Sequence, residues 1–277
     1  MQQVMLADGG MMPKLGLGTW HMGERARDED AEVQSLRHGL DLGINMIDTA
    51  EMYGDGGAER VVGRAIEGRR DQVFLVSKVY PHNASARGAI AACERSLTRL
   101  GTDRIDLYLL HWRGSIPLEQ TVLAFDRLVR DGKIGRWGVS NFDVDDMREL
   151  VALGAGGQCA IDQVYYSASQ RGVEFDLLPW LCARAMPLMA YCPLDQGALA
   201  QDPVLGQIGR EHGASAAQVA IAWLFARPGV VPIPKAGRVQ HVQELCRASE
   251  LKLTHQNLLD IDRHFPPPTR RQPLMIV

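Results

Sequence analysis

The sequence predicts a closed (β/α)8 barrel of the TIM type, preceded by a short β-hairpin that closes the bottom of the barrel. Eight short apolar runs alternate with helical patterns along the chain, and this alternation is typical of a parallel sheet covered by helices. The 277 residues fit one large domain. The chain has no linker, low-complexity tract or internal repeat, so we expect a single barrel domain over residues 1–277.

The expected elements follow one another without a break. The hairpin is expected over residues 4–14, with Asp8-Gly9-Gly10 as its turn. The expected strands are residues 15–19, 44–48, 73–78, 105–111, 135–140, 160–165, 187–191 and 230–233. The expected helices are residues 28–42, 58–67, 85–100, 118–130, 144–153, 174–184, 214–225, 239–248 and 254–264.

An open doubly wound sheet is the competing architecture. Such folds usually carry G-x-G-x-x-G directly after their first strand. Here the corresponding stretch, Gly16-Leu-Gly-Thr-Trp-His21, lacks the third glycine and follows a hairpin. The barrel is therefore favoured.

Composition excludes several classes of function. The chain has 30 basic and 33 acidic residues, a net charge of −3, so we expect no broad surface for nucleic acid. Five scattered cysteines without a C-x-x-C pair indicate reduced thiols. We see neither a signal peptide nor an apolar stretch long enough to cross a bilayer. We expect a soluble cytoplasmic protein without a membrane partner or a metal site.

Four ionisable side chains fall at the ends of three consecutive predicted strands, where barrels place their active sites. Asp48 ends one strand and Tyr53 lies on the Gly-rich loop after it, Lys78 ends the next strand, and His111 ends the third. We expect the lysine to lower the tyrosine pKa from about 10, with Asp48 as its counter-charge. His111 would donate a hydrogen bond to a developing oxyanion. The set predicts protonation of a carbonyl oxygen, with a hydride donor still to be supplied.

Each of these residues alone has an ordinary structural explanation. A lone lysine at a strand end is usually a solvated charge. A lone tyrosine on a Gly-rich loop more often serves packing, and a histidine at a strand end is more often a hydrogen-bonded residue of the core. A lyase that forms a Schiff base on Lys78 is an alternative, but it has no evident need for Tyr53. Convergence of four groups on one barrel face favours the carbonyl chemistry.

Several motifs occur together in order along the chain. They are Gly16-Leu-Gly-Thr-Trp20, Asp48-Thr-Ala-Glu-Met-Tyr-Gly54, Val76-Ser-Lys78, the run from Leu97 to His111, the run from Gly132 to Asn141, and Ile233-Pro-Lys235. Through these motifs the chain resembles the aldo-keto reductases over essentially its whole length. It is most similar to bacterial reductases of the methylglyoxal reductase type.

The resemblance implies a catalytic tetrad of Asp48, Tyr53, Lys78 and His111, and NADPH lying across the barrel mouth. The positions that hydrogen-bond the carboxamide of the nicotinamide are matched by Ser140, Asn141 and Gln163. Tyr191 matches the residue that stacks on the nicotinamide ring. The loop beside the pyrophosphate is matched by residues 192–197. The cofactor residues implied are Gly18, Thr19, Trp20, Asp48, Ser140, Asn141, Gln163, Tyr191, Cys192, Pro193, Leu194, Gln196, Gly197, Lys235, Ala236, Arg238, His241 and Glu244.

The expected 2′-phosphate site departs from the family pattern. Lys235 matches the lysine that meets this phosphate. Ala236, His241 and Leu245 stand where the family usually has Ser or Thr, Arg and Asn. Arg238 is the candidate replacement for the missing arginine. Cys192 likewise stands where Ser is common.

The resemblance implies NADPH-dependent reduction of small aldehydes and ketones to alcohols, with Tyr53 as general acid and detoxification as the role. The expected substrate pocket consists of Trp20, Met22, Met52, Tyr53, Tyr80, His111 and Trp112. The short stretch after His264 and the short loop after His111 predict an open site for methylglyoxal and for short or aromatic aldehydes. A non-catalytic, redox-sensing subunit that binds NADPH is a further alternative, and a monomer is the family-based expectation.

Overall fold

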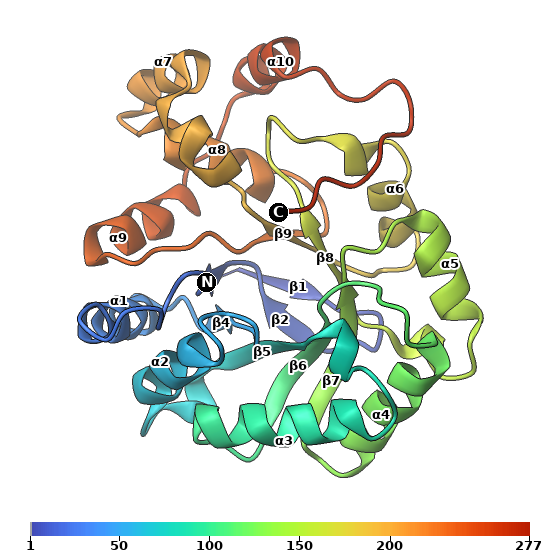
Figure 1. Cartoon of the computed structure of the whole chain (residues 1–277). Helices are drawn as coiled ribbons and strands as arrows, with labels where there is room; N and C mark the ends of the chain where they lie inside the picture. The colour runs from blue at the N-terminus through green and yellow to red at the C-terminus, as the bar shows by residue number, and fades with distance from the viewer. Residues whose placement is uncertain (1) are drawn as a thin grey trace.

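Eight parallel strands form one sheet in the order β10-β9-β8-β7-β6-β5-β4-β3. The computed structural model describes residues 2–277, and the sheet curves into a barrel surrounded by helices (Figure 1). It closes where the Gly18 N–H donates to the Pro234 carbonyl at 3.0 Å and where Gly18 bridges to Lys235. A Cβ on Gly18 would lie 2.9 Å from the Ile233 carbonyl oxygen, so this junction requires glycine. The predicted barrel is confirmed.

The observed strands agree with the predicted ones to within two residues at each end. They are β3 (Gly16–Gly18), β4 (Met46–Asp48), β5 (Phe74–Val79), β6 (Ile105–Leu110), β7 (Ile134–Ser140), β8 (Asp162–Tyr165), β9 (Leu188–Tyr191) and β10 (Val230–Pro232). The helices are α1 (Glu29–Asp41), α2 (Gly57–Ile66), α3 (Gly88–Leu100), α4 (Leu118–Arg130), α5 (Val144–Ala152), α6 (Leu177–Cys182), α7 (Pro203–His212), α8 (Ala216–Phe225), α9 (Val239–Ala248) and α10 (His255–His264). Within residues 2–277, no helix has the length and apolar character needed to cross a membrane.

The N-terminal hairpin closes the barrel floor. Strand β1 (Gln3–Met5) pairs antiparallel with β2 (Met11–Pro13). Leu6 and Met12 are buried in the same cluster as side chains of the barrel interior, Val76 among them. The hairpin therefore fills one end of the barrel and leaves the opposite end to form a site.

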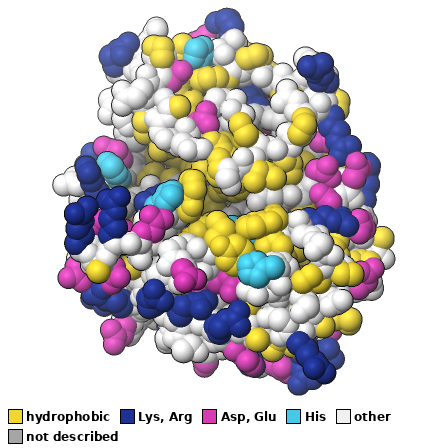
Figure 2. All heavy atoms as spheres, in the orientation of Figure 1, with side chains coloured by type: hydrophobic (Ala, Val, Ile, Leu, Met, Phe, Trp, Pro, Cys, Tyr) yellow, Lys and Arg dark blue, Asp and Glu magenta, His cyan; other side chains and the backbone are white. Residues whose placement is uncertain are grey.

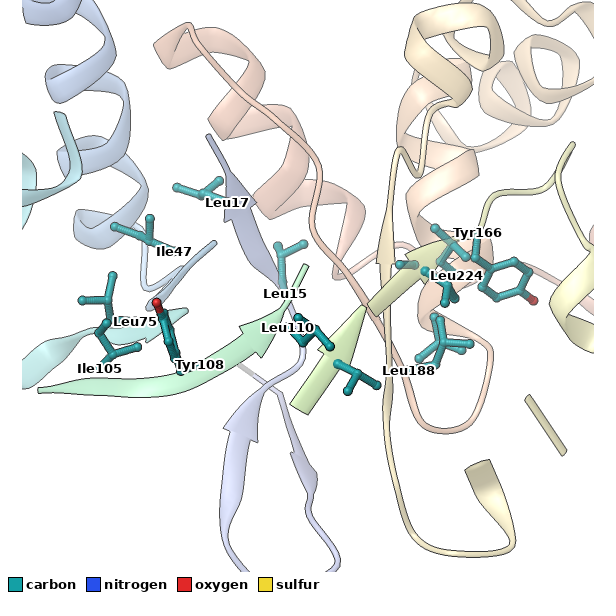
Figure 3. Packing of buried hydrophobic residues seen from close by; sticks show 14 of the residues in the cluster. Leu15, Leu17, Ile47, Leu75, Ile105, Tyr108, Leu110, Tyr166, Leu188 and Leu224 are labelled. Atoms are coloured by element: carbon teal, nitrogen blue, oxygen red, sulfur yellow. The ribbon is translucent and has the colours of Figure 1, made fainter. Parts of the chain in front are cut away.

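Alternation along the strands separates two cores. Leu107 of β6 belongs to the cluster inside the barrel. Its neighbour Tyr108 belongs to the other cluster, together with Leu75 (Figure 3), and its ring lies edge-on to Phe125 of α4. Residues two apart in a strand face the same side. Lys78 therefore shares the inward direction of Val76 in β5, one layer closer to the carboxyl ends of the strands. The pattern that builds the core also delivers the lysine to the mouth.

Helix α7 was not among the predicted helices. Gly206 and Gly209 interrupt its apolar pattern, and glycine has a low helix propensity. The signals at its ends are nevertheless clear. Asp202 accepts hydrogen bonds from two N–H groups of the first turn, a proline occupies the first position, and Gly213 ends the helix at φ 63°. Capping signals identify this helix better than periodicity does.

Candidate active site

A cavity of about 450 Å³ opens at the carboxyl ends of the barrel strands. Apolar side chains gather across the middle of this face of the molecule (Figure 2). Asp48, Tyr53 and His111 line the cavity, and Lys78 lies buried directly beneath them. The structure thus brings together the four side chains predicted from consecutive strand ends.

The Lys78 ammonium is the centre of this group. It donates hydrogen bonds to Oδ2 of Asp48 at 2.7 Å, to the Thr49 carbonyl at 2.9 Å and to the Tyr53 hydroxyl at 3.2 Å. The other oxygen of Asp48 accepts a hydrogen bond from the Gln163 amide at 2.8 Å. Lys78 and Asp48 are almost completely buried, and a buried ion pair is tolerated only when both charges are fully hydrogen bonded. That condition is met here.

His111 closes the group on the cavity side. Its ring lies edge-on to Tyr53, with centroids 5.6 Å apart. Burial, reinforced by the Lys78 ammonium, holds the pKa of His111 well below its usual range. The imidazole is therefore neutral near pH 7, and a neutral imidazole keeps one N–H that can donate to a ligand oxygen.

The Tyr53 phenol keeps its proton more firmly than the sequence led us to expect. Burial raises the pKa of Tyr53 well above its usual value, and the nearby Asp48 carboxylate adds to this effect. The expectation that this pKa is lowered is therefore wrong, because the loss of hydration on burial is the largest cause and raises it. Tyr53 is consequently a neutral phenol near pH 7, with a proton available for donation.

Most of the predicted cofactor residues line the same cavity. They are Gly18, Thr19, Trp20, Asp48, Ser140, Asn141, Gln163, Tyr191, Cys192, Pro193, Leu194, Gln196, Gly197 and Lys235. Hydrogen bonds join those on β7, β8 and β9. Tyr191 donates to Oδ1 of Asn141 at 2.8 Å, and the hydroxyl of Ser140 donates to the Gln163 carbonyl at 2.8 Å. These strand ends form one connected polar wall.

The remaining predicted cofactor residues lie outside the cavity. Ala236 is buried, and its carbonyl accepts a hydrogen bond from the Ser35 hydroxyl at 2.6 Å. Arg238 precedes the first turn of α9, and His241 and Glu244 are exposed on that helix. Any contact of these four residues with a cofactor stays a prediction.

Two of the predicted substrate residues do not line the cavity. Met22 is fully buried in the core between barrel and helices, because the chain reverses at His21 (φ 61°) and Gly23 (φ 69°) and turns Met22 inward. Tyr80 packs edge-on against Trp112 at 5.7 Å and stays outside the cavity. Contrary to the prediction, neither residue is part of the pocket lining. Trp20, Met52, Tyr53, His111 and Trp112 do line it.

Sequence reasoning missed the end of the chain. Ile276 and Val277 line the cavity, and the segment after α10 runs back across the barrel to its mouth (Figure 1). Arg271 fastens this segment through ion pairs to Asp143, Asp145 and Asp176 at 3.1, 2.6 and 3.2 Å. His21, Ile233 and Pro234 also line the cavity without having been predicted. The segment is short, as expected, yet it reaches the site.

The described residues, 2–277, contain no group of His, Cys, Asp and Glu side chains that could hold a metal ion.

Comparisons with known proteins agree with this geometry. The model of the aldo/keto reductase family matches residues 14–265. Methylglyoxal reductase YeaE of Escherichia coli (strain K12) is 50% identical over 284 residues, covering 100% of both chains. An aldo/keto reductase from Klebsiella pneumoniae, solved in complex with NADP and acetate, has a TM-score of 0.97 and 48% identity, covering 99% of each chain. A structure of an aldo-keto reductase from the same organism with NADPH has the same TM-score and identity and covers 100% of this chain and 99% of that chain.

The fold and these relatives define an oxidoreductase built on a (β/α)8 barrel. The chain belongs to the aldo/keto reductase family, as its motifs predicted.

Proposed function

We propose that this protein uses NADPH to reduce small aldehydes and ketones, including 2-oxoaldehydes of the methylglyoxal kind, with Tyr53 as the general acid. The observation that carries the proposal is the buried hydrogen-bonded chain from Asp48 through Lys78 to the Tyr53 hydroxyl, which ends at a cavity. The 50% identity to a methylglyoxal reductase supports the substrate class. The five free thiols agree with a cytoplasmic location.

The residues present fit NADPH, which supplies the hydride when it is bound. Hydroxyl and amide groups of Ser140, Asn141 and Gln163 line the cavity and suit the carboxamide. Tyr191 offers an aromatic ring beside them. Lys235 is exposed at the rim and forms no ion pair with another residue of the described chain, so its charge is free for a phosphate.

Tyr53 and His111 would act together on the carbonyl oxygen of the substrate. The neutral His111 orients this oxygen by donating a hydrogen bond, and its donation strengthens as negative charge develops there. Tyr53 then transfers its proton to the oxygen, which completes the alcohol. Lys78, whose ammonium lies 3.2 Å from the Tyr53 oxygen, stabilises the phenolate that is left. Asp48 keeps the buried ammonium paired throughout.

Loss of the Tyr53 hydroxyl tests the mechanism. We expect Tyr53→Phe to lower kcat for methylglyoxal by at least about 10²-fold, since a general acid contributes about 10² to 10⁴ in rate. NADPH consumption by absorbance measures turnover, and fluorescence titration measures NADPH binding, which should survive. Near wild-type turnover of the variant would refute the role of Tyr53 as acid.

The geometry disfavours a lyase that forms a Schiff base on Lys78. The ammonium donates three hydrogen bonds and is fully buried beneath the cavity, so its nitrogen has no free lone pair or open path for attack on a carbonyl. Borohydride trapping in the presence of methylglyoxal tests this directly: we expect no covalent adduct at Lys78.

A further inference from the structure

The loop of residues 192–197 is a strained wall of the cavity. Cys192, Asp195 and Gln196 have left-handed backbone angles, with φ of 49°, 49° and 53°. Residues with a Cβ adopt such angles at a cost in free energy, and they keep them only where the surrounding structure imposes them. Something outside the loop must therefore hold it in this shape.

Two hydroxyl groups hold the side chain of Asp195. Tyr165 donates to Oδ1 of Asp195 at 2.5 Å, and Ser169 donates to Oδ2 at 2.8 Å. Tyr165 is the last residue of β8 and is 3% exposed, so one end of this contact is fixed to the barrel. The carboxylate of a residue with a left-handed backbone is thus held from two sides.

Tyr165 also touches the aromatic part of the proposed cofactor site. Its ring lies edge-on to that of Tyr191, with centroids 5.4 Å apart and planes at 65°. Tyr191 in turn donates to Asn141. One side chain therefore contacts both the loop beside the expected pyrophosphate and the ring beside the expected nicotinamide.

We infer that Tyr165 and Ser169 are positioning residues that hold the loop of residues 192–197 in its left-handed shape before NADPH binds, and thereby set the affinity for NADPH. The inference rests on the proposed cofactor site. Without the two hydroxyl groups, the loop relaxes to less strained angles, and only a fraction of molecules has the binding-competent shape. The apparent affinity is multiplied by that fraction, while proton transfer from Tyr53 is unaffected.

The test removes single hydroxyl groups. Tyr165→Phe keeps the ring against Tyr191, and Ser169→Ala removes the second donor. We expect each variant to raise the Kd for NADPH about tenfold, the scale of one hydrogen bond to a charged group. The kcat at saturating NADPH and the KM for methylglyoxal should stay within about twofold of wild type. Fluorescence titration with NADPH and steady-state kinetics measure these quantities.

A neighbouring tyrosine provides the matched control. Tyr166 is fully buried, and its hydroxyl donates a hydrogen bond to Glu174 at 2.6 Å. Glu174 does not line the cavity. Tyr166→Phe removes a comparable bond to a carboxylate and should leave the Kd for NADPH unchanged. A fall in Tm common to both variants, with an unchanged Kd in Tyr165→Phe, would mean that the hydroxyl has only a structural role and would overturn the inference.

A glycine at position 195 tests whether Tyr165 acts through Asp195 or contacts NADPH directly. Asp195→Gly removes the carboxylate that accepts both hydroxyl bonds, while glycine adopts a positive φ without penalty, so any effect of Tyr165 that passes through Asp195 is absent in this background. In the Asp195→Gly background, Tyr165→Phe should leave the Kd for NADPH unchanged, and a further tenfold loss there would contradict the inference. Failure of the wild-type protein to bind NADPH would instead refute the proposed cofactor itself.

Discussion

The Gln163 side-chain amide donates to Oδ1 of Asp48 at 2.8 Å, although the two residues are 115 positions apart. Gln163 belongs to the wall predicted to face the carboxamide, whereas Asp48 carries the counter-charge of Lys78. Substitution of either residue would therefore remove a hydrogen-bond partner of the other. The proposed hydride and proton sites share one buried carboxylate.

Removing the buried ammonium should damage both activity and stability. Lys78→Met leaves Asp48 as an unpaired buried carboxylate, which costs about 3–5 kcal/mol in the free energy of unfolding. We expect kcat to fall by at least about 10²-fold, because the Tyr53 phenolate loses its cation. Urea denaturation and methylglyoxal reduction measure the two effects.

A double variant separates the two effects of Lys78→Met. Replacing both charges, as in Asp48→Asn with Lys78→Met, should restore part of the lost stability and none of the activity. Unchanged stability of Lys78→Met alone would contradict the buried ion pair.

Stability should decline as the pH falls below about 6.5, partly through His111. Burial lowers the pKa of His111 well below its usual 6.5. Above this pH both the folded and the unfolded states hold a neutral imidazole, so the folded state has its full stability. Below it the unfolded state binds the extra proton, and the free energy of unfolding drops by up to about 1.4 kcal/mol per pH unit. Denaturation of wild type and His111→Gln at several pH values should show a shallower decline in the variant, and parallel curves would exclude this source.

Cofactor choice should depend on the rim of the cavity. Lys235→Ala should raise the Kd for NADPH by about 10- to 100-fold, the range expected for hydrogen bonds to a charged phosphate. The Kd for NADH should stay unchanged, because NADH has no 2′-phosphate. Arg238→Ala tests the candidate replacement arginine in the same way, and Arg247→Ala, exposed on α9, is the control. Equal losses for NADPH and NADH would refute recognition of the phosphate by Lys235.

Release of the segment after α10 should change the handling of the substrate with little effect on folding. Arg271→Ala removes three ion pairs, and exposed pairs contribute little to stability. We expect Tm to stay close to wild type and the KM for apolar aldehydes to rise, because Ile276 and Val277 no longer wall the cavity. Arg148→Ala is the control, since Arg148 also pairs with Asp145. An equal change of KM in both variants would contradict the role of the segment.

Local patterns in the sequence were sufficient for the barrel and for the convergence of Asp48, Lys78 and His111. Strand ends follow from short apolar runs, and the period of two decides which side chains face inward. That Tyr53 reaches Lys78 depends only on a short loop after Asp48. This part of the site is local, and it was predicted.

Other features depend on contacts or backbone angles that no local pattern reveals. Met22 was misplaced because the left-handed turn at His21 decides its direction. Ile276 was missed because its position follows from ion pairs of Arg271 with α5 and the residues before α6. The pKa of Tyr53 was misjudged because its largest cause is burial, which the sequence does not quantify.

The junction between β3 and β10 should open less often when a ligand fills the cavity. At this junction Gly18 meets Pro234 and Lys235 through one hydrogen bond and one isolated bridge, and all three residues also line the cavity. A molecule that fills the cavity would therefore contact both the first and the last strand of the barrel. Binding to the folded state suppresses local opening. The exchange rate of the Gly18 amide proton should therefore fall as the fraction of protein with a bound ligand rises.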